Sequence, residues 1–185
     1  PEYHQKAAEL FLTDVVTPGW ESGTNRIWVV EVDGVFVGQV DLKGEGPIKE
    51  IAYVTHPGFR NRGVTRAAVR LVLNYAFTDL NTDVVRWCAR VGNVPSLKVA
   101  YSCGFTMHET IPRMLHEHGQ AHDAWTGSIA FGEPSYPTRE WAASRIAGDR
   151  VALRPLTERD FERWDEALNA GAAQTYLVST TGAYA

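Results

Sequence analysis

Residues 54–77 read VTHPGFRNRGVTRAAVRLVLNYAF, and this stretch decides the fold. A short apolar strand ends at Pro57, and a helix with one apolar face begins a few residues later. The loop between them carries Arg60, Arg62 and Gly63. Because the first N–H groups of a helix lack partners within it and lie at the positive end of its dipole, such a loop favours a bound phosphate. The same pattern also occurs where a helix start is only capped on a solvated face, so both alternatives stay open.

The flanking segments alternate between helical and strand patterns. Apolar residues recur with helical spacing in residues 2–16, and residues 26–42 read as two strands about the turn Asp33-Gly34. Further strands are expected at residues 48–57, 83–91 and 124–131, and further helices at 62–79 and 93–105. The apolar face of the helix at 62–79 is predicted to comprise Val64, Ala68, Leu71, Val72 and Tyr75. This order predicts a mixed α/β domain with antiparallel hairpins.

The composition is that of an ordinary globular protein. The chain has 185 residues, of which 44% are hydrophobic, and this is enough to bury a core. Its net charge of −4 and its scattered arginines argue against nucleic acid as a partner. Since no apolar run is long enough to span a membrane and no leader pattern is present, we expect a cytoplasmic protein with no membrane partner. Cys88 and Cys103 are expected to be reduced core residues.

A second motif follows the strand predicted at 83–91. It reads NVPS at residues 93–96, with Gly104 and Phe105 after it. Together with the loop RNRGVT at residues 60–65, this motif resembles the GNAT superfamily of acetyl-CoA-dependent N-acetyltransferases. In that superfamily such a loop binds pyrophosphate and such a helix flanks the pantetheine arm. Within it, the sequence most resembles the branch of ribosomal-protein-alanine N-acetyltransferases.

The resemblance covers residues 1–132 and implies the GNAT fold, a central, mostly antiparallel twisted sheet with splayed central strands, flanked by helices. It also implies acetyl-CoA as the co-substrate. The acceptor would be a primary amine, either a protein N-terminus or a small molecule, which attacks the thioester directly in a ternary complex. The implied cofactor-binding residues are Tyr53, Val54, Arg60, Arg62, Gly63, Val64, Thr65, Arg66, Asn93 and Ser96.

Two positions depart from the family pattern. Thr65 stands where the loop has Gly or Ala, which crowds the phosphates but leaves the backbone amides available. Ala100 stands where many relatives have a proton-donating tyrosine, and Tyr101 lies about 100° further around the helix. The resemblance therefore points to Ser96 as the group that protonates or polarises the leaving thiolate, unless Ser96 only bonds backbone early in its helix. A non-catalytic acyl-CoA-binding regulatory module is the alternative function.

The general base is sought among carboxylates near the thioester. Strand alternation places Glu50, Ala52 and Val54 on one face of the strand that leads there. Glu50 is the first candidate, and a solvent-facing glutamate at a strand end is the alternative reading. Glu117, in the loop MLHEHGQAHD at residues 114–123, is the second candidate. Three histidines lie in the same loop, but no cysteine stands at metal-ligand spacing, so no metal is expected.

The two ends of the chain carry a further expectation. The GNAT core at residues 1–132 lacks the first strand and helix of the fold, and residues 133–148 read as a linker. Residues 149–185 resemble the missing opening, or the start of a second GNAT domain. We expect this segment to dock on the core, in the same chain or swapped into a neighbour to form a homodimer. It is expected to hold a strand at 150–156, an N-cap at Thr157 and an amphipathic helix through Phe161, Trp164 and Leu168.

Overall fold

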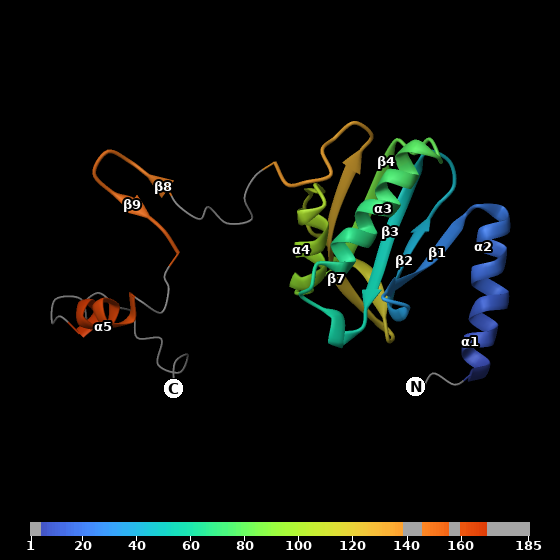
Figure 1. Cartoon of the computed structure of the whole chain (residues 1–185), viewed down its shortest axis with the longest axis horizontal. Coiled ribbons are helices and arrows are strands. Elements are labelled where there is room, and N and C mark those ends of the chain that lie inside the picture. Colours follow the sequence, from blue (N-terminus) through green and yellow to red (C-terminus); the bar gives the residue numbers. More distant parts are fainter. Residues whose placement is uncertain (1–4, 139–145, 156–159, 170–185) are drawn as a thin grey trace. The chain divides into compact units, whose positions relative to one another are not determined.

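The computed structural model describes residues 5–138, 146–155 and 160–169 of the chain (Figure 1). The chain divides into two compact units, residues 1–141 and 142–185, and each is described by itself. The larger unit contains the sheet and helices that correspond to the predicted core. Within the described residues, no helix is both long enough and apolar enough to cross a membrane.

The larger unit begins with a helical segment that continues past its predicted end at residue 16. It comprises α1 (Gln5–Phe11), a π-helical stretch (Leu12–Val16) and α2 (Thr17–Ser22). Pro18 in the first turn of α2 lacks a backbone N–H, which interrupts the regular hydrogen-bond ladder at that point. The segment ends at Gly23, whose φ of 72° is a left-handed conformation typical of helix ends.

The sheet of the larger unit has seven strands in the order β1-β2-β3-β4-β7-β5, with β6 paired to β7. Among the pairs in this sheet, β3 and β4 run parallel and the others run antiparallel. This arrangement confirms the predicted fold class. The strands are β1 (Asn25–Val32), β2 (Val35–Lys43), β3 (Ile48–Thr55), β4 (Val84–Arg90), β5 (Thr106–Met107), β6 (Ile111–Glu117) and β7 (Gln120–Ala130).

The two central strands pair over only part of their length. Four residues of β3 pair with four of β4, and the last pair joins Ile51 to Trp87. Beyond that pair, β3 stays bonded to β2 as far as Thr55, whereas β4 stays bonded to β7 as far as Arg90. The strands therefore part into a V-shaped opening, called the splay below, which agrees with the splayed strands that the sequence predicts.

Two helices, α3 (Val64–Thr78) and α4 (Val94–Ser102), cover one face of this sheet. In Figure 1, α3 lies across β3. Alternate residues of the strands point into the core beneath the helices, and the others form the opposite face, called the far face below. The buried core includes Val40, Leu42, Ile51, Val69, Val72, Leu73, Ala76, Val85, Trp87, Ala100, Cys103, Phe105 and Ile129.

The buried face of α3 differs from the predicted one. Leu71 was predicted to face the core, but its side chain is 74% exposed, while Val69 and Leu73 are buried. The helix is rotated so that Ala68, Leu71 and Tyr75 lie toward β1 and not toward the middle of the sheet. The prediction chose a neighbouring apolar stripe because α3 has apolar residues around more than half of its circumference.

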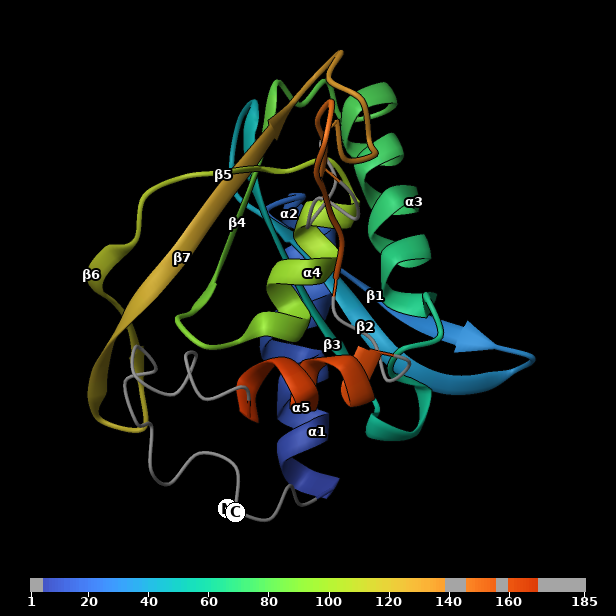
Figure 2. The same ribbon diagram turned by 90° about the vertical axis from the view of Figure 1, so that its left-hand side faces the viewer.

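The segment predicted as a loop at residues 114–123 is instead part of a long hairpin, formed by β6 and β7 and visible in Figure 2. The two strands are joined by His118-Gly119, whose φ values of 50° and 78° are typical of a two-residue hairpin turn. The prediction missed β6 because its residues are nearly all exposed, so the strand shows no buried alternation. The strand predicted at 124–131 accordingly begins earlier, at Gln120.

Gly104, of the second motif, is held in place by the segment that follows β7. A Cβ atom at Gly104 would come within 2.1 Å of the Pro134 carbonyl oxygen, and the φ of this glycine is 89°. Both facts require glycine at the end of α4. Part of the predicted linker at 133–148 thus packs against the larger unit, and Phe105 enters the core with 3% exposure.

The smaller unit contains short elements. Strand β8 (Ile146–Ala147) pairs with β9 (Ala152–Leu153), and α5 (Phe161–Asn169) follows. The helix was predicted, but the strand expected at 150–156 is two residues long because its partner is only the two-residue β8. Arg154 and the Asp160 carboxylate form a two-pronged ion pair. Thr157 and residues 170–185 lie outside the described residues.

Candidate functional site

A groove of about 780 Å³ opens where the splay meets the N-terminal ends of α3 and α4. It is called the loop groove below. Its walls come from the end of β3, from the loop before α3 and from one side of α4. The lining residues are Tyr53, Val54, Thr55, Phe59, Arg60, Asn61, Gly63, Val64, Thr65, Arg66, Asn93, Pro95, Ser96, Lys98, Val99 and Ser102. Of the ten predicted cofactor-binding residues, all but Arg62 lie in this lining.

The loop before α3 delivers unpaired backbone donors to the loop groove. A short 3₁₀ turn (Pro57–Phe59) leads into the loop, and Gly63 is the N-cap of α3 with a φ of 76°. The first helical hydrogen bond runs from the Ala67 N–H to the Gly63 carbonyl at 3.0 Å. The N–H groups of Val64, Thr65 and Arg66 therefore have no acceptor within the helix, and they lie at its positive end.

The Thr65 side chain turns away from these donors. Its hydroxyl lies 2.5 Å from the hydroxyl of Thr55, at the end of β3. This bond ties the first turn of α3 to the strand that forms the other wall of the loop groove. Thr65 therefore replaces the Gly or Ala of the family pattern while its backbone N–H stays available.

Cationic side chains differ in how they approach the loop groove. Arg60 and Arg66 line it, and the Arg60 Nε donates to the Thr55 carbonyl at 3.3 Å. Lys98, on α4, adds a third positive charge that the sequence analysis did not identify. Arg62 instead places its guanidinium 5.3 Å from the centre of the Phe59 ring. The positive lining suits an anionic ligand.

The N-terminus of α4 is the second helix start at the loop groove. Asn93 is its N-cap, and the Asn93 Oδ1 accepts a hydrogen bond from the Ser96 N–H at 3.3 Å. Pro95 occupies the first turn, where a missing N–H costs nothing. The structure thus gives Asn93 a capping role that orients α4 toward the splay.

Ser96 belongs to a hydrogen-bonded group of three side chains. The Trp87 Nε1 donates to the Ser96 Oγ at 3.1 Å, and the Ser96 hydroxyl donates to the Tyr53 hydroxyl oxygen at 3.2 Å. The Tyr53 hydroxyl in turn donates to the Ser96 carbonyl at 2.8 Å. Burial raises the pKa of the Tyr53 phenol, so it stays protonated at neutral pH. The group bridges β3, β4 and α4 at the splay.

The two predicted carboxylates lie outside the lining of the loop groove. Glu50 is on the far face of β3, and its Oε1 lies 2.8 Å from the Lys43 Nζ. Glu117 is exposed beside the hairpin turn between β6 and β7, because residues 114–123 form a hairpin and not a loop. The structure therefore brings neither carboxylate together with Ser96.

The structure also places the predicted residues at the end of α4 and the possible metal ligands of the hairpin. Ala100 is fully buried, and Tyr101 is absent from the lining of the loop groove. Asp123, near the three histidines, accepts a hydrogen bond from the Arg113 N–H at 2.9 Å. In the part of the chain that the structure describes, no group of three or more metal-ligating side chains lies together.

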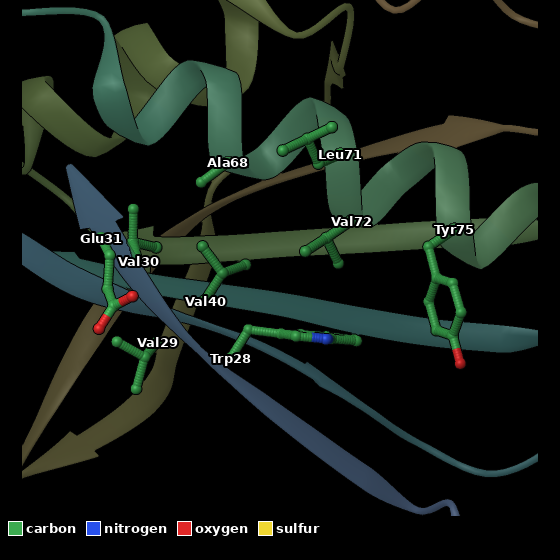
Figure 3. Close-up of a pocket in the computed structure, with 9 residues that line it drawn as sticks. All are labelled: Trp28, Val29, Val30, Glu31, Val40, Ala68, Leu71, Val72 and Tyr75. Atoms are coloured by element: carbon green, nitrogen blue, oxygen red, sulfur yellow. The ribbon is translucent and has the colours of Figure 1, made fainter. Parts of the chain in front are cut away.

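A second groove, called the flank groove below, runs between α3 and the edge strand β1 (Figure 3). Its volume is about 420 Å³. Unlike the loop groove, it has no helix terminus in its wall, and valines and aromatic rings dominate the view in Figure 3. Its lining residues are Trp28, Val29, Val30, Glu31, Val40, Ala68, Leu71, Val72 and Tyr75.

The sequence matches a known family over more than half of its length. Residues 1–106 match the model described as "Acetyltransferase (GNAT) domain". The chain belongs to this family, which confirms the resemblance noted from its two motifs. Over 117 residues it is 32% identical to "Putative ribosomal N-acetyltransferase YdaF" of Bacillus subtilis (strain 168), covering 60% of this chain and 64% of that protein.

Solved structures show the same fold. RimJ of Mycobacterium smegmatis, in complex with CoA-disulfide, superposes with a TM-score of 0.64 at 23% identity, covering 68% of this chain and 61% of that one. Spermidine N-acetyltransferase from Vibrio cholerae, in complex with CoA and spermine, gives a TM-score of 0.61 at 18% identity, covering 72% of this chain and 80% of that one. At these identities the likeness establishes the fold.

Proposed function

We propose that this chain is an acetyl-CoA-dependent N-acetyltransferase that moves an acetyl group to a primary amine, either a protein N-terminus or a small molecule. The observation that carries the proposal is the loop groove. It combines two helix N-termini and cationic side chains with a gap between two strands. A pyrophosphate needs the first two features, and an extended pantetheine arm needs the third. A volume of about 780 Å³ is that of a small-molecule site.

In this proposal, the pyrophosphate binds the N–H groups at the start of α3, with Arg60 and Arg66 beside it. The pantetheine arm enters the splay and pairs with backbone groups of Tyr53 and Val54, which β4 leaves unpaired at this point. Arg62 contributes through its stacking on Phe59, which holds the loop. The thioester then lies at the vertex of the splay, near Ser96.

The transfer is a direct attack in a ternary complex. The amine nitrogen attacks the thioester carbon, the carbonyl electrons move to oxygen, and the C–S bond breaks as the carbonyl re-forms. The thiolate needs a proton, and Ser96 relays it: its O–H turns from Tyr53 and gives its proton to the sulfur, and its oxygen regains a proton that the amine nitrogen loses. The Trp87 N–H holds the Ser96 oxygen in place during that turn. Glu50 and Glu117, the acceptors that the sequence predicts for the amine proton, both lie outside the lining of the loop groove.

The relatives support both CoA as the carrier of the acetyl group and an amine as its acceptor. The RimJ structure holds CoA-disulfide, and the Vibrio cholerae structure holds CoA with a polyamine. The name of the Bacillus subtilis relative supports a ribosomal protein as the acceptor. This chain spans 64% of that relative's length. The use of acetyl-CoA and the identity of the acceptor amine are therefore proposed for this chain.

The test measures thiol release from acetyl-CoA with a panel of peptide N-termini and small amines, and identifies acetylated products by mass spectrometry. Amine-dependent release supports the transferase. Calorimetric binding of CoA without thiol release with any amine would instead favour the acyl-CoA-binding regulatory module. That alternative stands because Ala100 has no hydroxyl to protonate the thiolate.

Ser96→Ala should lower kcat and leave CoA affinity within about twofold, because the proposed partner of the Ser96 hydroxyl is a charge that exists only as the thiolate departs. Tyr101→Phe should change neither value by more than about twofold, since Tyr101 is outside the loop groove lining.

A further inference from the structure

The vertex of the splay is bordered by side chains on both faces of the sheet. Tyr53 and Trp87 point to the face that α3 and α4 cover, because both bond to Ser96 there. Ala52 and Cys88 are the next residues after the last β3–β4 pair in one strand and in the other. Strand alternation places both side chains on the far face. The far face therefore reaches the vertex at these two residues.

Asp41 lies directly beside this vertex. It is the partner of Ala52 across β2 and β3, so its side chain also lies on the far face. Asp41, Ala52 and Cys88 follow one another across β2, β3 and β4, and all three are half-buried. Because neighbouring strands are about 4.8 Å apart, the Asp41 carboxylate is one strand away from the vertex.

The Asp41 carboxylate accepts a hydrogen bond but forms no ion pair among the described residues. The Gln39 Nε2 donates to the Asp41 Oδ1 at 3.1 Å, and no ion pair joins Asp41 to another described residue. Lys43, the next charged residue on β2, is paired with Glu50. Burial raises the pKa of the Asp41 carboxyl, while the Gln39 bond and the Lys43 charge lower it. On β4, burial and then the Glu50 charge raise the pKa of the Cys88 thiol, so the thiol is neutral.

We propose that Asp41 binds the ammonium group of the acceptor on the far face and takes the proton that the amine must lose. The proposal rests on the proposed function, because it requires a thioester at the vertex of the splay. The thioester then arrives from the loop groove and the amine from the opposite side of the sheet. The two reactants meet between Ala52 and Cys88.

The proton and electron transfers balance. The ammonium gives one proton to the Asp41 carboxylate, and the neutral amine attacks the thioester carbon. The C–N bond forms and the C–S bond breaks, after which the thiolate takes a second proton from the nitrogen, directly or through Ser96. The products are the amide, the CoA thiol and a protonated Asp41, which returns its proton to water.

Asp41 fits this task better than Glu50 for three reasons. Glu50 is two residues from Ala52, which is about 6.6 Å further along the strand. Its carboxylate is also held by Lys43 at 2.8 Å, so binding an ammonium would require that pair to separate. The exposed Arg86, which is aligned with Glu50 across β3 and β4, adds a second positive charge at that position.

An α-amine is the acceptor that a carboxylate deprotonates most readily, because the α-amino group has a pKa of about 8, whereas a lysine-type amine has a pKa of about 10.4. Alanine amide, which carries an α-amine, is therefore the probe for the test.

The experiment compares the full chain with Asp41→Asn, Asp41→Glu and the competitor Glu50→Gln. Asp33→Asn is the matched control, because Asp33 lies in the β1–β2 turn with a φ of 52°, a conformation that asparagine also adopts. Calorimetry with CoA bound measures the affinity for alanine amide as an α-amine probe. Thiol release then gives kcat/KM as a function of pH. Thermal unfolding checks the fold, and Asp41→Asn should not lower stability, since it removes a carboxylate whose ionised form burial disfavours.

If the proposal holds, Asp41→Asn weakens alanine amide binding at least tenfold and leaves CoA affinity within twofold. It also moves the fall in kcat/KM toward acidic pH up to the pKa of the free amine, about 8, because the variant can use only the neutral amine. Asp41→Glu should recover part of the binding. No binding of alanine amide to the wild-type chain, or equal binding by Asp41→Asn, would overturn it. So would a larger loss with Glu50→Gln than with Asp41→Asn. Asp41-dependent binding without thiol release would instead refute the proposed transferase and keep the amine site.

Discussion

The loop groove and the flank groove both border α3, yet chemically different groups line them. The loop groove lies at the N-terminus of the helix and is lined by free N–H groups, arginines and a lysine. The flank groove lies along the side of the same helix and is lined mainly by valines, Trp28 and Tyr75. A helix end offers charge and hydrogen-bond donors, whereas a helix side offers apolar surface. The two grooves therefore suit different chemical groups, anionic groups in one and apolar groups in the other.

The largest expected effect, on the folding of the core, concerns the burial of apolar side chains that the smaller unit exposes. The smaller unit exposes Val151, Leu153, Phe161 and Trp164 by 65%, 58%, 55% and 45%. We propose that residues 150–170 pack on the core, in the same chain or swapped into a neighbouring copy, because exposed apolar surface favours association. Deleting residues 149–185 should then leave an insoluble or molten core, which near-UV circular dichroism and dye binding would detect.

A soluble 1–148 fragment that unfolds cooperatively would contradict this docking. Within the full chain, Trp164→Asp tests the same contact without truncation. It should lower the free energy of unfolding by about 1 kcal/mol or more if the helix packs on a core, and by less than about 0.5 kcal/mol if its exposed face stays in water. The molecular mass in solution separates docking within one chain from exchange between two copies.

The second prediction tests whether the two grooves are energetically independent. Trp28 makes edge-to-face contacts with Trp20 and Tyr75, with ring centres 5.3 Å and 5.7 Å away. Trp28→Ala should lower the free energy of unfolding by about 2–3 kcal/mol, because it removes a large partly buried ring and two aromatic contacts. The CoA affinity of the folded protein should stay within about twofold.

The control for that change is its neighbour on the same strand. Val29 is 58% exposed, so Val29→Ala should alter the free energy of unfolding by less than about 0.5 kcal/mol. Chemical denaturation measures both variants, and calorimetry measures CoA binding. A tenfold loss of CoA affinity in Trp28→Ala would mean that the two grooves are coupled through α3.

The third prediction distinguishes two arginines that the sequence alone treats alike. Arg66 lines the loop groove, whereas the Arg62 guanidinium lies over Phe59. Arg66→Glu should weaken CoA binding at least tenfold, about 1.4 kcal/mol, because a negative charge would face the pyrophosphate. Arg62→Glu is the matched control with the same change of charge, and its effect should be several times smaller. Equal losses in calorimetry would place both arginines at the phosphate.

The loop groove could be predicted from sequence because its signals are local. Gly63, the flanking arginines and the Asn93 cap lie in two short motifs, and each motif opens a helix. A helix start fixes the direction of its own N–H groups, so the residues need no distant partner to point at a ligand. Lys98 could have been found by the same reasoning, since it lies three residues after Pro95 on the same side of α4.

The far side of the splay could not be predicted in this way. Asp41 reads as an ordinary charged residue in a strand, and only its pairing with Ala52 shows that it borders the vertex. Strand register joins residues that are distant in sequence, and a change of one residue would move Asp41 to the other face. The β6–β7 hairpin escaped prediction for local reasons. Strand β6 is nearly all exposed, and its turn is His118-Gly119, not one of the dipeptides that usually mark such turns.

The smallest expected effect concerns how closely the loop approaches its ligand. Gly63 has a φ of 76°, and a Cβ atom there would meet only the Arg66 Nη2 at 3.7 Å, an ordinary contact. Gly63→Ala should therefore cost about 1 kcal/mol of stability through its left-handed backbone, without a clash. Since Gly63 lines the loop groove, the added methyl should also weaken CoA binding by about threefold to tenfold.

Gly46→Ala is the matched control, because Gly46 has a φ of 64° and no atom within 4 Å of its Cβ position. Both variants should lose similar stability in chemical denaturation, while only Gly63→Ala should lose CoA affinity in calorimetry. If the two variants bind CoA equally well, the phosphates do not approach the backbone at Gly63. This part of the loop groove would then bind no phosphate, like the flank groove.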